Sequence, residues 1–285
     1  MIPEVYMFIN ENRERMLKKI KEDEEMARKV KEMWNESAIG NSSANFAGID
    51  SSWNSTRHHG FFFYIVDAVA VDSSGNNVVP PKYVADIDTP TTSEDGVIAY
   101  NTQRYLQSIG MEFEYNLAVE ASEKGYTALI DNSALALIYN RHSKKEEIFI
   151  EYAKDLIHNR NVIFIAKTSE TKNDLQGNVG DIYYYTKYTA RAGISKVRYD
   201  QHGVSVFYAR LADWAPVIKV EVPGQLNESE ALRVAETLNS VSVNGYPYPL
   251  LLAHRTCKVT EEDMKIAESL LGLGVEASAR EVLWE

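Results

Sequence analysis

The stretch Phe46-Ala47-Gly48-Ile49-Asp50-Ser51-Ser52 is a short apolar run that closes on an aspartate. A second run of this kind, Ala128-Leu129-Ile130-Asp131-Asn132-Ser133, stands far downstream. Short apolar runs bounded by polar residues are typical of buried strands. We therefore expect Asp50 and Asp131 each at a strand end, where a carboxylate can face a metal ion.

Each aspartate has a structural alternative. Asp50 can cap the turn that follows it, because aspartate side chains often bond to nearby backbone. Asp131 can cap a helix beginning near Ala134.

A third carboxylate stands on a helix expected from about residue 94 to 124. The helical spacing of three or four puts it on an apolar face, whose members are Met111, Glu114, Leu117, Ala118 and Ala121. A glutamate that points to the core is costly to bury without a cation or donor. Glu112 falls elsewhere but stays in reserve, because a small phase error would exchange the two. The alternative is that Glu114 lies at the edge of the face and reaches water.

Three carboxylates suit hard divalent cations such as manganese and magnesium. Two such ions, about 4 Å apart, can activate a water and stabilise the leaving oxygen of a phosphodiester. This chemistry makes Asp50, Glu114 and Asp131 candidate metal ligands.

Near the C-terminus, the segment Gly245-Tyr246-Pro247-Tyr248-Pro249-Leu250-Leu251-Leu252-Ala253-His254-Arg255 is expected to enter a helix. His254 can bind manganese, orient a water or donate a proton; the alternative is a satisfied core histidine. Tyr246 and Tyr248 can hold a phosphate or stack on a base, or else pack around the two prolines.

Lys167 ends the apolar run Val162-Ile163-Phe164-Ile165-Ala166, in parallel with the two aspartates. It can neutralise a phosphate, or form a structural salt bridge. The adjacent His58 and His59 would point apart on a strand, which disfavours a joint metal site.

The remaining pattern predicts a mixed α/β sheet flanked by helices, with an RNase H-like core. It includes one long N-terminal helix over about 4–36 with a stripe of Met16, Ile20, Ala27, Val30 and Trp34, then a linker over 35–45. Strands are expected to end at Asp50 and to cover 61–71, 78–87, 126–131, 162–167, 193–199, 204–211 and 217–222. Helices are expected over 146–158, 227–241 (with a capping box at Asn227 and Glu230), 248–257 and 260–271. We divide the chain into an N-terminal helix and linker, 1–40, and a catalytic domain, 41–285.

Composition narrows the class of protein. The net charge of −11 over 285 residues argues against coating nucleic acid with the whole surface. The single cysteine, Cys257, excludes an internal disulfide and a cysteine-based zinc site. No apolar run approaches a membrane span and no secretory signal is visible, so we expect a cytoplasmic protein without membrane contact.

Taken together, these motifs resemble the NurA family of archaeal and bacterial nucleases. The resemblance rests on the Asp50 and Asp131 motifs, the Glu114 helix, Ala166-Lys167-Thr168-Ser169, and the segment from Gly245 to Arg255. It runs from about residue 45 to 271.

The resemblance implies an RNase H-like, manganese-dependent nuclease, with magnesium as a possible substitute. It implies action on single- and double-stranded DNA ends, often 5′ to 3′, as a homodimer with the hexameric HerA translocase in end resection. Asp50, Glu114 and Asp131 would bind metal, His254 would assist, and Tyr246 would lie beside the site.

The chain departs from the family in having Ser51 and Asn132 where glycine is usual. Two alternatives stay open: another RNase H-like phosphoesterase, acting on junctions or RNA, and a weakly active subunit that mainly binds a motor ATPase. The chain lacks a Walker-type Gly-rich loop, so any ATP-driven motion must come from a partner.

Overall fold

The computed structural model describes residues 2–18, 20, 24–89, 102–139 and 147–273. Its contacts divide the chain into two compact units. Unit 1 joins Met1–Ser43 with Ile165–Tyr246, and unit 2 joins Ala44–Phe164 with Pro247–Glu285. The boundary predicted after residue 40 stays a prediction.

The sheet of unit 2 has the RNase H-like arrangement. Strands β2 (Phe46–Arg57), β3 (Phe62–Val71) and β4 (Lys82–Asp88) form an antiparallel meander. Strand β5 (Thr127–Ile130) runs parallel to β2, and β6 (Val162–Ala166) runs parallel to β5. The order β4-β3-β2-β5-β6 therefore places β2 and β5 side by side at the centre.

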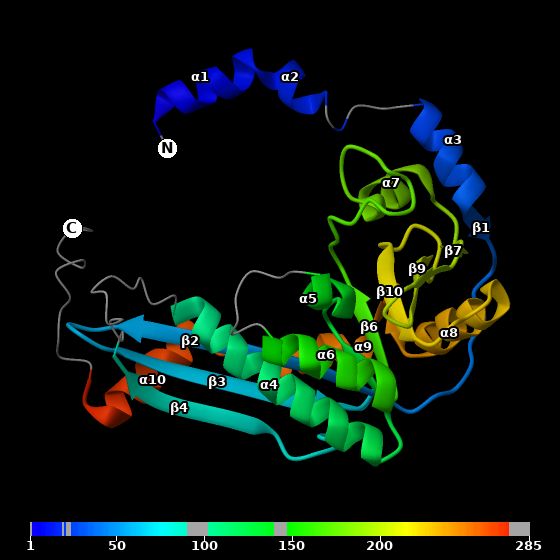
Figure 1. Cartoon of the computed structure of the whole chain (residues 1–285). Coiled ribbons are helices and arrows are strands. Elements are labelled where there is room, and N and C mark those ends of the chain that lie inside the picture. The colour runs from blue at the N-terminus through cyan, green and yellow to red at the C-terminus, as the bar shows by residue number, and fades with distance from the viewer. Residues whose placement is uncertain (1, 19, 21–23, 90–101, 140–146, 274–285) are drawn as a thin grey trace. The chain divides into compact units, whose positions relative to one another are not determined.

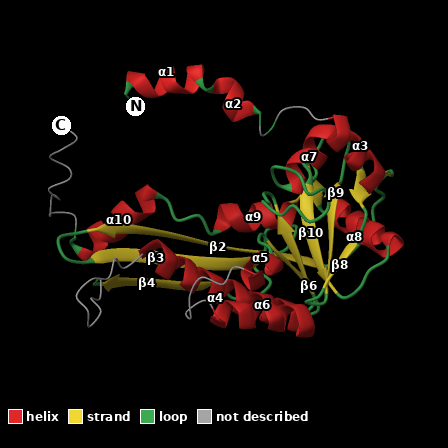
Figure 2. Ribbon diagram, turned by 45° about the horizontal axis from the view of Figure 1, so that its top comes forward, coloured by secondary structure: helices red, strands yellow, loops and turns green. Residues whose placement is uncertain are grey.

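Helices cover both faces of this sheet (Figures 1 and 2). Helices α4 (Thr102–Glu123) and α6 (Glu147–Asn159) lie over one face, and α9 (Tyr248–Thr256) and α10 (Glu261–Leu271) lie over the other. The short helix α5 (Ala134–Tyr139) follows β5. The apolar face of α4 buries Leu106, Leu117, Ala118 and Ala121, which fixes its orientation toward the sheet.

A glycine sets the close approach of α9 to β2. A Cβ atom added to Gly48 would lie 2.2 Å from the backbone carbon of Pro249. Only glycine leaves room for this contact, so the start of α9 packs directly on the central strand.

The main strands of unit 1 follow the order β1-β7-β9-β10, with β8 paired to β9. Its strands are β1 (Trp34–Glu36), β7 (Gly193–Ser195), β8 (Arg198–Asp200), β9 (Val204–Arg210) and β10 (Ile218–Pro223), with β11 (Ser242–Val243) and β12 (Tyr246–Pro247) as a separate pair. Its helices are α1 (Pro3–Glu11), α2 (Arg13–Leu17), α3 (Glu24–Met33), α7 (Asp181–Tyr188) and α8 (Glu228–Ser240). The capping box predicted for α8 is confirmed.

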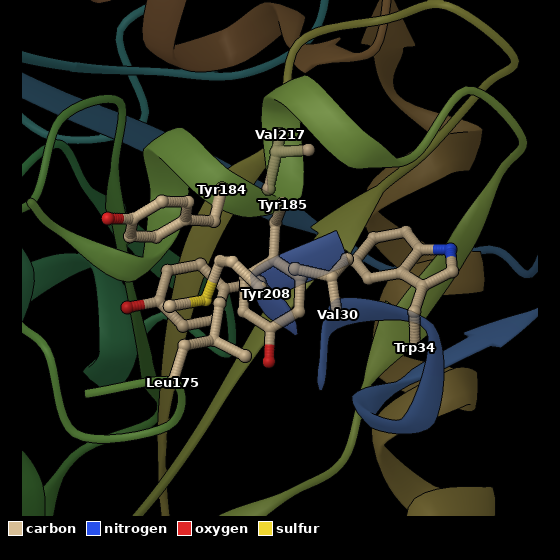
Figure 3. Close-up of a cluster of buried hydrophobic side chains, with 8 residues drawn as sticks. Val30, Trp34, Leu175, Tyr184, Tyr185, Tyr208 and Val217 are labelled. Carbon is tan, nitrogen blue, oxygen red and sulfur yellow. The ribbon is translucent and has the colours of Figure 1, made fainter. Parts of the chain in front are cut away.

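An aromatic core joins α3, β1, α7 and β9 within unit 1 (Figure 3). The ring of Tyr185 lies 4.8 Å from that of Tyr208 and 5.6 Å from that of Trp34. Val30 completes this core from α3. The end of the N-terminal segment is therefore part of a packed unit.

The prediction of one long helix over 4–36 is wrong. Asn12, with φ −101° and ψ 7°, separates α1 from α2, and its side-chain amide donates to the Phe8 carbonyl. Trp34 leaves the helix to pair as a strand with Ser195, because this places its ring in the aromatic core. The predicted stripe is split accordingly: Val30 and Trp34 are buried, whereas Met16 is 41% exposed.

The prediction that a strand ends at Asp50 is also wrong. Strand β2 continues to Arg57 because β3 pairs with it residue by residue as far as Phe62. Elsewhere, β4 begins only at Lys82, after the two prolines, and β1 takes the first residues of the predicted linker. Helix α7 was not predicted, and residues 94–101 of the predicted α4 lie outside the described part of the chain.

Across the described ranges, the structure contains no helix with the length and apolar character needed to cross a membrane.

Candidate active site

Asp50 and Ser51 direct their side chains toward different helices, as neighbouring residues on a strand do. The Nδ1 atom of His254, on α9, lies 2.8 Å from Oδ2 of Asp50. The Asp50 side chain is 15% exposed and that of His254 is 58% exposed. His254 is therefore not a core histidine: a carboxylate holds it at the surface.

Ser51 contacts the second carboxylate. Its hydroxyl donates to Oε1 of Glu114 over 2.5 Å. Glu114 is partly buried on α4, and Glu112 is exposed. The helical phase therefore directs Glu114, and not Glu112, to the sheet.

Asp131 follows the last paired residue of β5. Ile130 pairs with Ile49, so Asp131 and Asp50 come next along two parallel neighbouring strands. The hydroxyl of Ser133 accepts from the Ala136 amide at the start of α5. Ser133 therefore caps the start of α5.

The three carboxylates interact electrostatically. Burial raises the pKa of Glu114 to about 7, the Ser51 hydrogen bond opposes this rise, and the charges of Asp50 and Asp131 add to it. Burial also raises the pKa of Asp50, against the hydrogen bond from His254 and with a contribution from Asp131. Negative charges close together in a partly buried site repel one another, so such carboxylates tend to bind protons or cations.

An apolar hollow beside Glu114 explains its desolvation. The hollow contains about 380 Å³ of empty space, which includes space open to solvent. Its walls include Met111, Ile130, Phe149, Leu156 and Phe164. A carboxylate next to such walls loses hydration, which is the largest cause of the raised pKa.

The donor chemistry of the site fits a hard divalent ion. Carboxylate oxygens are the preferred ligands of manganese and magnesium, and imidazole is a further ligand for manganese. Within the described residues, no three His, Cys, Asp or Glu side chains form a preassembled metal cluster. In this structure Asp50 bonds to His254, and Glu114 bonds to Ser51.

The sequence interpretation missed Asp67. On β3, Val69 pairs with Asp50 and Asp67 pairs with Ser52, so Asp67 and Asp50 share one face of the sheet. Burial first, then the charges of Asp263 and Asp50, raise the pKa of Asp67 to about 6. Its Oδ1 atom is buried and has no hydrogen-bond partner among the described residues. One signal was available: an isolated aspartate inside an otherwise apolar strand.

The other candidate residues fall in both units. In unit 1, the ammonium group of Lys167 lies 4.8 Å from the centre of the Tyr246 ring, and Lys167 is exposed. In unit 2, Tyr248 is the first residue of α9 and is half-buried. His58 contacts Glu268 over 3.3 Å.

The fold and the acidic site define an RNase H-like α/β protein with carboxylates on its central strands. The family model described as "NurA domain" matches residues 44–259, and the chain belongs to this family. Among curated proteins it is similar to the DNA double-strand break repair nuclease NurA of Saccharolobus solfataricus, at 24% identity, with 87% of each chain covered.

Solved structures show the same fold. The crystal structure of the NurA nuclease from Sulfolobus solfataricus matches with a TM-score of 0.77 and 23% identity, over 95% of this chain and 97% of that one. A crystal structure of NurA bound to dAMP and manganese matches with a TM-score of 0.60 and 12% identity, over 99% and 98%.

Proposed function

We propose that the chain is a divalent-metal-dependent DNA nuclease that hydrolyses phosphodiester bonds at DNA ends. The observation that carries the proposal is the placement of Asp50 and Asp131 at the same level of two neighbouring parallel strands, with Glu114 bonded to Ser51, the residue after Asp50. Membership of the NurA family and similarity to a curated double-strand break repair nuclease support the choice of DNA.

Asp50, Glu114 and Asp131 are the proposed metal ligands, with His254 as a further candidate. Manganese is the proposed ion and magnesium the substitute; a related NurA was crystallised with manganese and dAMP. When bound, such an ion lowers the pKa of a coordinated water and stabilises charge on phosphate oxygens.

His254 is the proposed group for proton transfer. Asp50 accepts from its Nδ1, which orients the ring and favours the tautomer with the proton on that atom. The second ring nitrogen, Nε2, then takes a proton from the attacking water or orients that water. Water adds to phosphorus, the bond to the leaving oxygen breaks, and that oxygen takes up a proton.

Lys167, Tyr246 and Tyr248 are proposed to bind substrate. Lys167 is exposed, and its ammonium group suits a DNA phosphate, while tyrosine rings suit stacking on bases. We further propose a homodimer that works with a HerA-like hexameric ATPase. Exposed apolar side chains on α1 and α2 support such contacts, for example Tyr6 (59%), Met7 (62%) and Phe8 (52%).

The test is cleavage of end-labelled linear DNA by the purified full chain with manganese, magnesium or a chelator. We expect cleavage with either ion and none with chelator. Faster cleavage of a four-way junction or of RNA would instead favour another phosphoesterase. Failure to cut any of these, together with binding to a hexameric ATPase, would favour a weakly active partner subunit.

A further inference from the structure

Ser51 stands beside one proposed metal ligand and touches another. It follows Asp50 on β2, and its hydroxyl donates to Oε1 of Glu114 over 2.5 Å. We infer that Ser51 is a positioning residue, whose hydroxyl holds the Glu114 carboxylate in the orientation that binds the divalent ion. This inference rests on the proposed function.

The strand gives Ser51 this position. Side chains alternate along β2, so Asp50 is directed to His254 and the next residue to α4. One backbone segment therefore carries one proposed ligand, Asp50, and contacts a second, Glu114, that comes from another element. The glutamate side chain has several rotatable bonds, and a hydrogen bond to its charged end restricts them.

Gly110 on α4 makes the contact possible. It lies one helical turn before Glu114 and on the same face of the helix. A Cβ atom added there would lie 2.7 Å from the Ser51 hydroxyl oxygen and 3.3 Å from its Cβ. Glycine is a poor helix former, and here its missing side chain leaves the space that the hydroxyl occupies.

The close approach of Gly110 to Ser51 allows two roles of the Ser51 hydroxyl to be distinguished: filling space and orienting Glu114. A hydroxyl that merely fills space would tolerate rotation about its Cα–Cβ bond. A hydroxyl that orients Glu114 would not, because rotation breaks the bond to Oε1. Gly110→Ala therefore perturbs the same function as Ser51→Ala without removing any polar atom.

The experiment measures manganese binding to the full chain by calorimetry in the absence of DNA. The variants are Ser51→Ala, Gly110→Ala and Glu114→Gln. The matched control is Ser52→Ala, because Ser52 is the next residue and its hydroxyl accepts from the Val259 amide instead. Thermal unfolding of each variant checks the fold.

We expect Ser51→Ala and Gly110→Ala to weaken manganese binding by about tenfold or more, as loss of a hydrogen bond to a charged group typically does. Ser52→Ala should bind as the wild type does. The manganese concentration that half-saturates cleavage should rise in the first two variants, with KM for DNA unchanged.

Wild-type manganese affinity in folded Ser51→Ala and Gly110→Ala, with loss of affinity in Glu114→Gln, would overturn the inference and leave the proposed function standing. Wild-type affinity in Glu114→Gln would overturn the ligand assignment and the inference with it. If Ser51→Ala does not fold, the manganese affinity of Gly110→Ala is the test: wild-type affinity overturns the inference, and weakened affinity supports it.

Discussion

The imidazole of His254 and the carboxylate of Asp50 form a 2.8 Å hydrogen bond between α9 and the middle of β2. The pair is asymmetric in exposure, with the carboxylate largely covered and the imidazole open to solvent. Gly48 allows this geometry, because α9 packs against β2 at its backbone. The pair therefore presents a fixed imidazole at the surface of the proposed active site.

The first prediction concerns the aspartates. Asp50→Ala and Asp131→Ala should each reduce cleavage of linear DNA by about a hundredfold or more, because each removes a ligand whose ion stabilises charge on the phosphate. End-labelled DNA with manganese or magnesium gives the measurement. Retention of full cleavage by both folded variants, or by the wild type in chelator, would contradict the metal mechanism.

The second prediction compares two glutamates on α4. Glu114→Gln should abolish cleavage, whereas Glu112→Gln should keep most of it, because only Glu114 is directed to the sheet and bonded by Ser51. The two changes are chemically identical and lie half a turn apart, so each controls for the other. The reverse order of activities would exclude Glu114 as the ligand.

The third prediction concerns His254. His254→Ala should lower cleavage by about 10²–10⁴-fold, the usual contribution of a general acid or base. DNA binding and the melting temperature should change little, because the side chain is 58% exposed. His59→Ala, at another exposed histidine, is the control. A His254→Ala protein that fails to fold would show a structural role instead.

The fourth prediction concerns Asp67 and pH. Its folded pKa, raised to about 6, lies above the ordinary value of an aspartate, so the folded state binds the proton more tightly than the unfolded state. The stability that this proton supplies is present below about pH 4 and is lost as pH rises through about 6. Asp67→Asn mimics the protonated form, so it should unfold at higher denaturant than the wild type at pH 8.

At pH 8 we expect the free energy of unfolding of Asp67→Asn to exceed that of the wild type by about 1–2 kcal/mol, a value discounted for the partial exposure of Asp67. Urea unfolding at pH 4 and pH 8 checks this, and the difference between the two proteins should shrink at pH 4. An Asp67→Asn protein that is less stable than the wild type at pH 8 would show that the buried Asp67 carboxylate does not destabilise the folded state when it is charged.

The fifth prediction concerns assembly. A chain that starts at Glu24 lacks α1 and α2 but keeps Val30 and Trp34, which belong to the core of unit 1. We expect the full chain to be a dimer, and the shortened chain to lose dimerisation or binding to the motor ATPase. Light scattering and co-elution give the readouts. A monomeric full chain, or a shortened chain that keeps both interactions, would contradict the assignment.

The sequence by itself determined most of the strands and helices and the class of the fold, a mixed α/β sheet with an RNase H-like core. Alternating and continuous apolar runs identified β3, β5 and β6, and the helical period of α4 selected Glu114 over Glu112. These are local properties, because side-chain direction follows directly from the repeat of the element. The capping box at Asn227 was readable for the same reason.

Tertiary structure decided the rest. Asp50 lies inside a strand because β3 continues to pair beyond it, and Trp34 is a strand residue because Tyr185 offers it an aromatic surface. Three features depend on residues far apart in sequence: the bond from Ser51 to Glu114, the space that Gly110 leaves for Ser51, and the position of Asp67 on the same face as Asp50. No local pattern encodes such contacts, since their energy depends on burial and on partners that only the folded chain brings together.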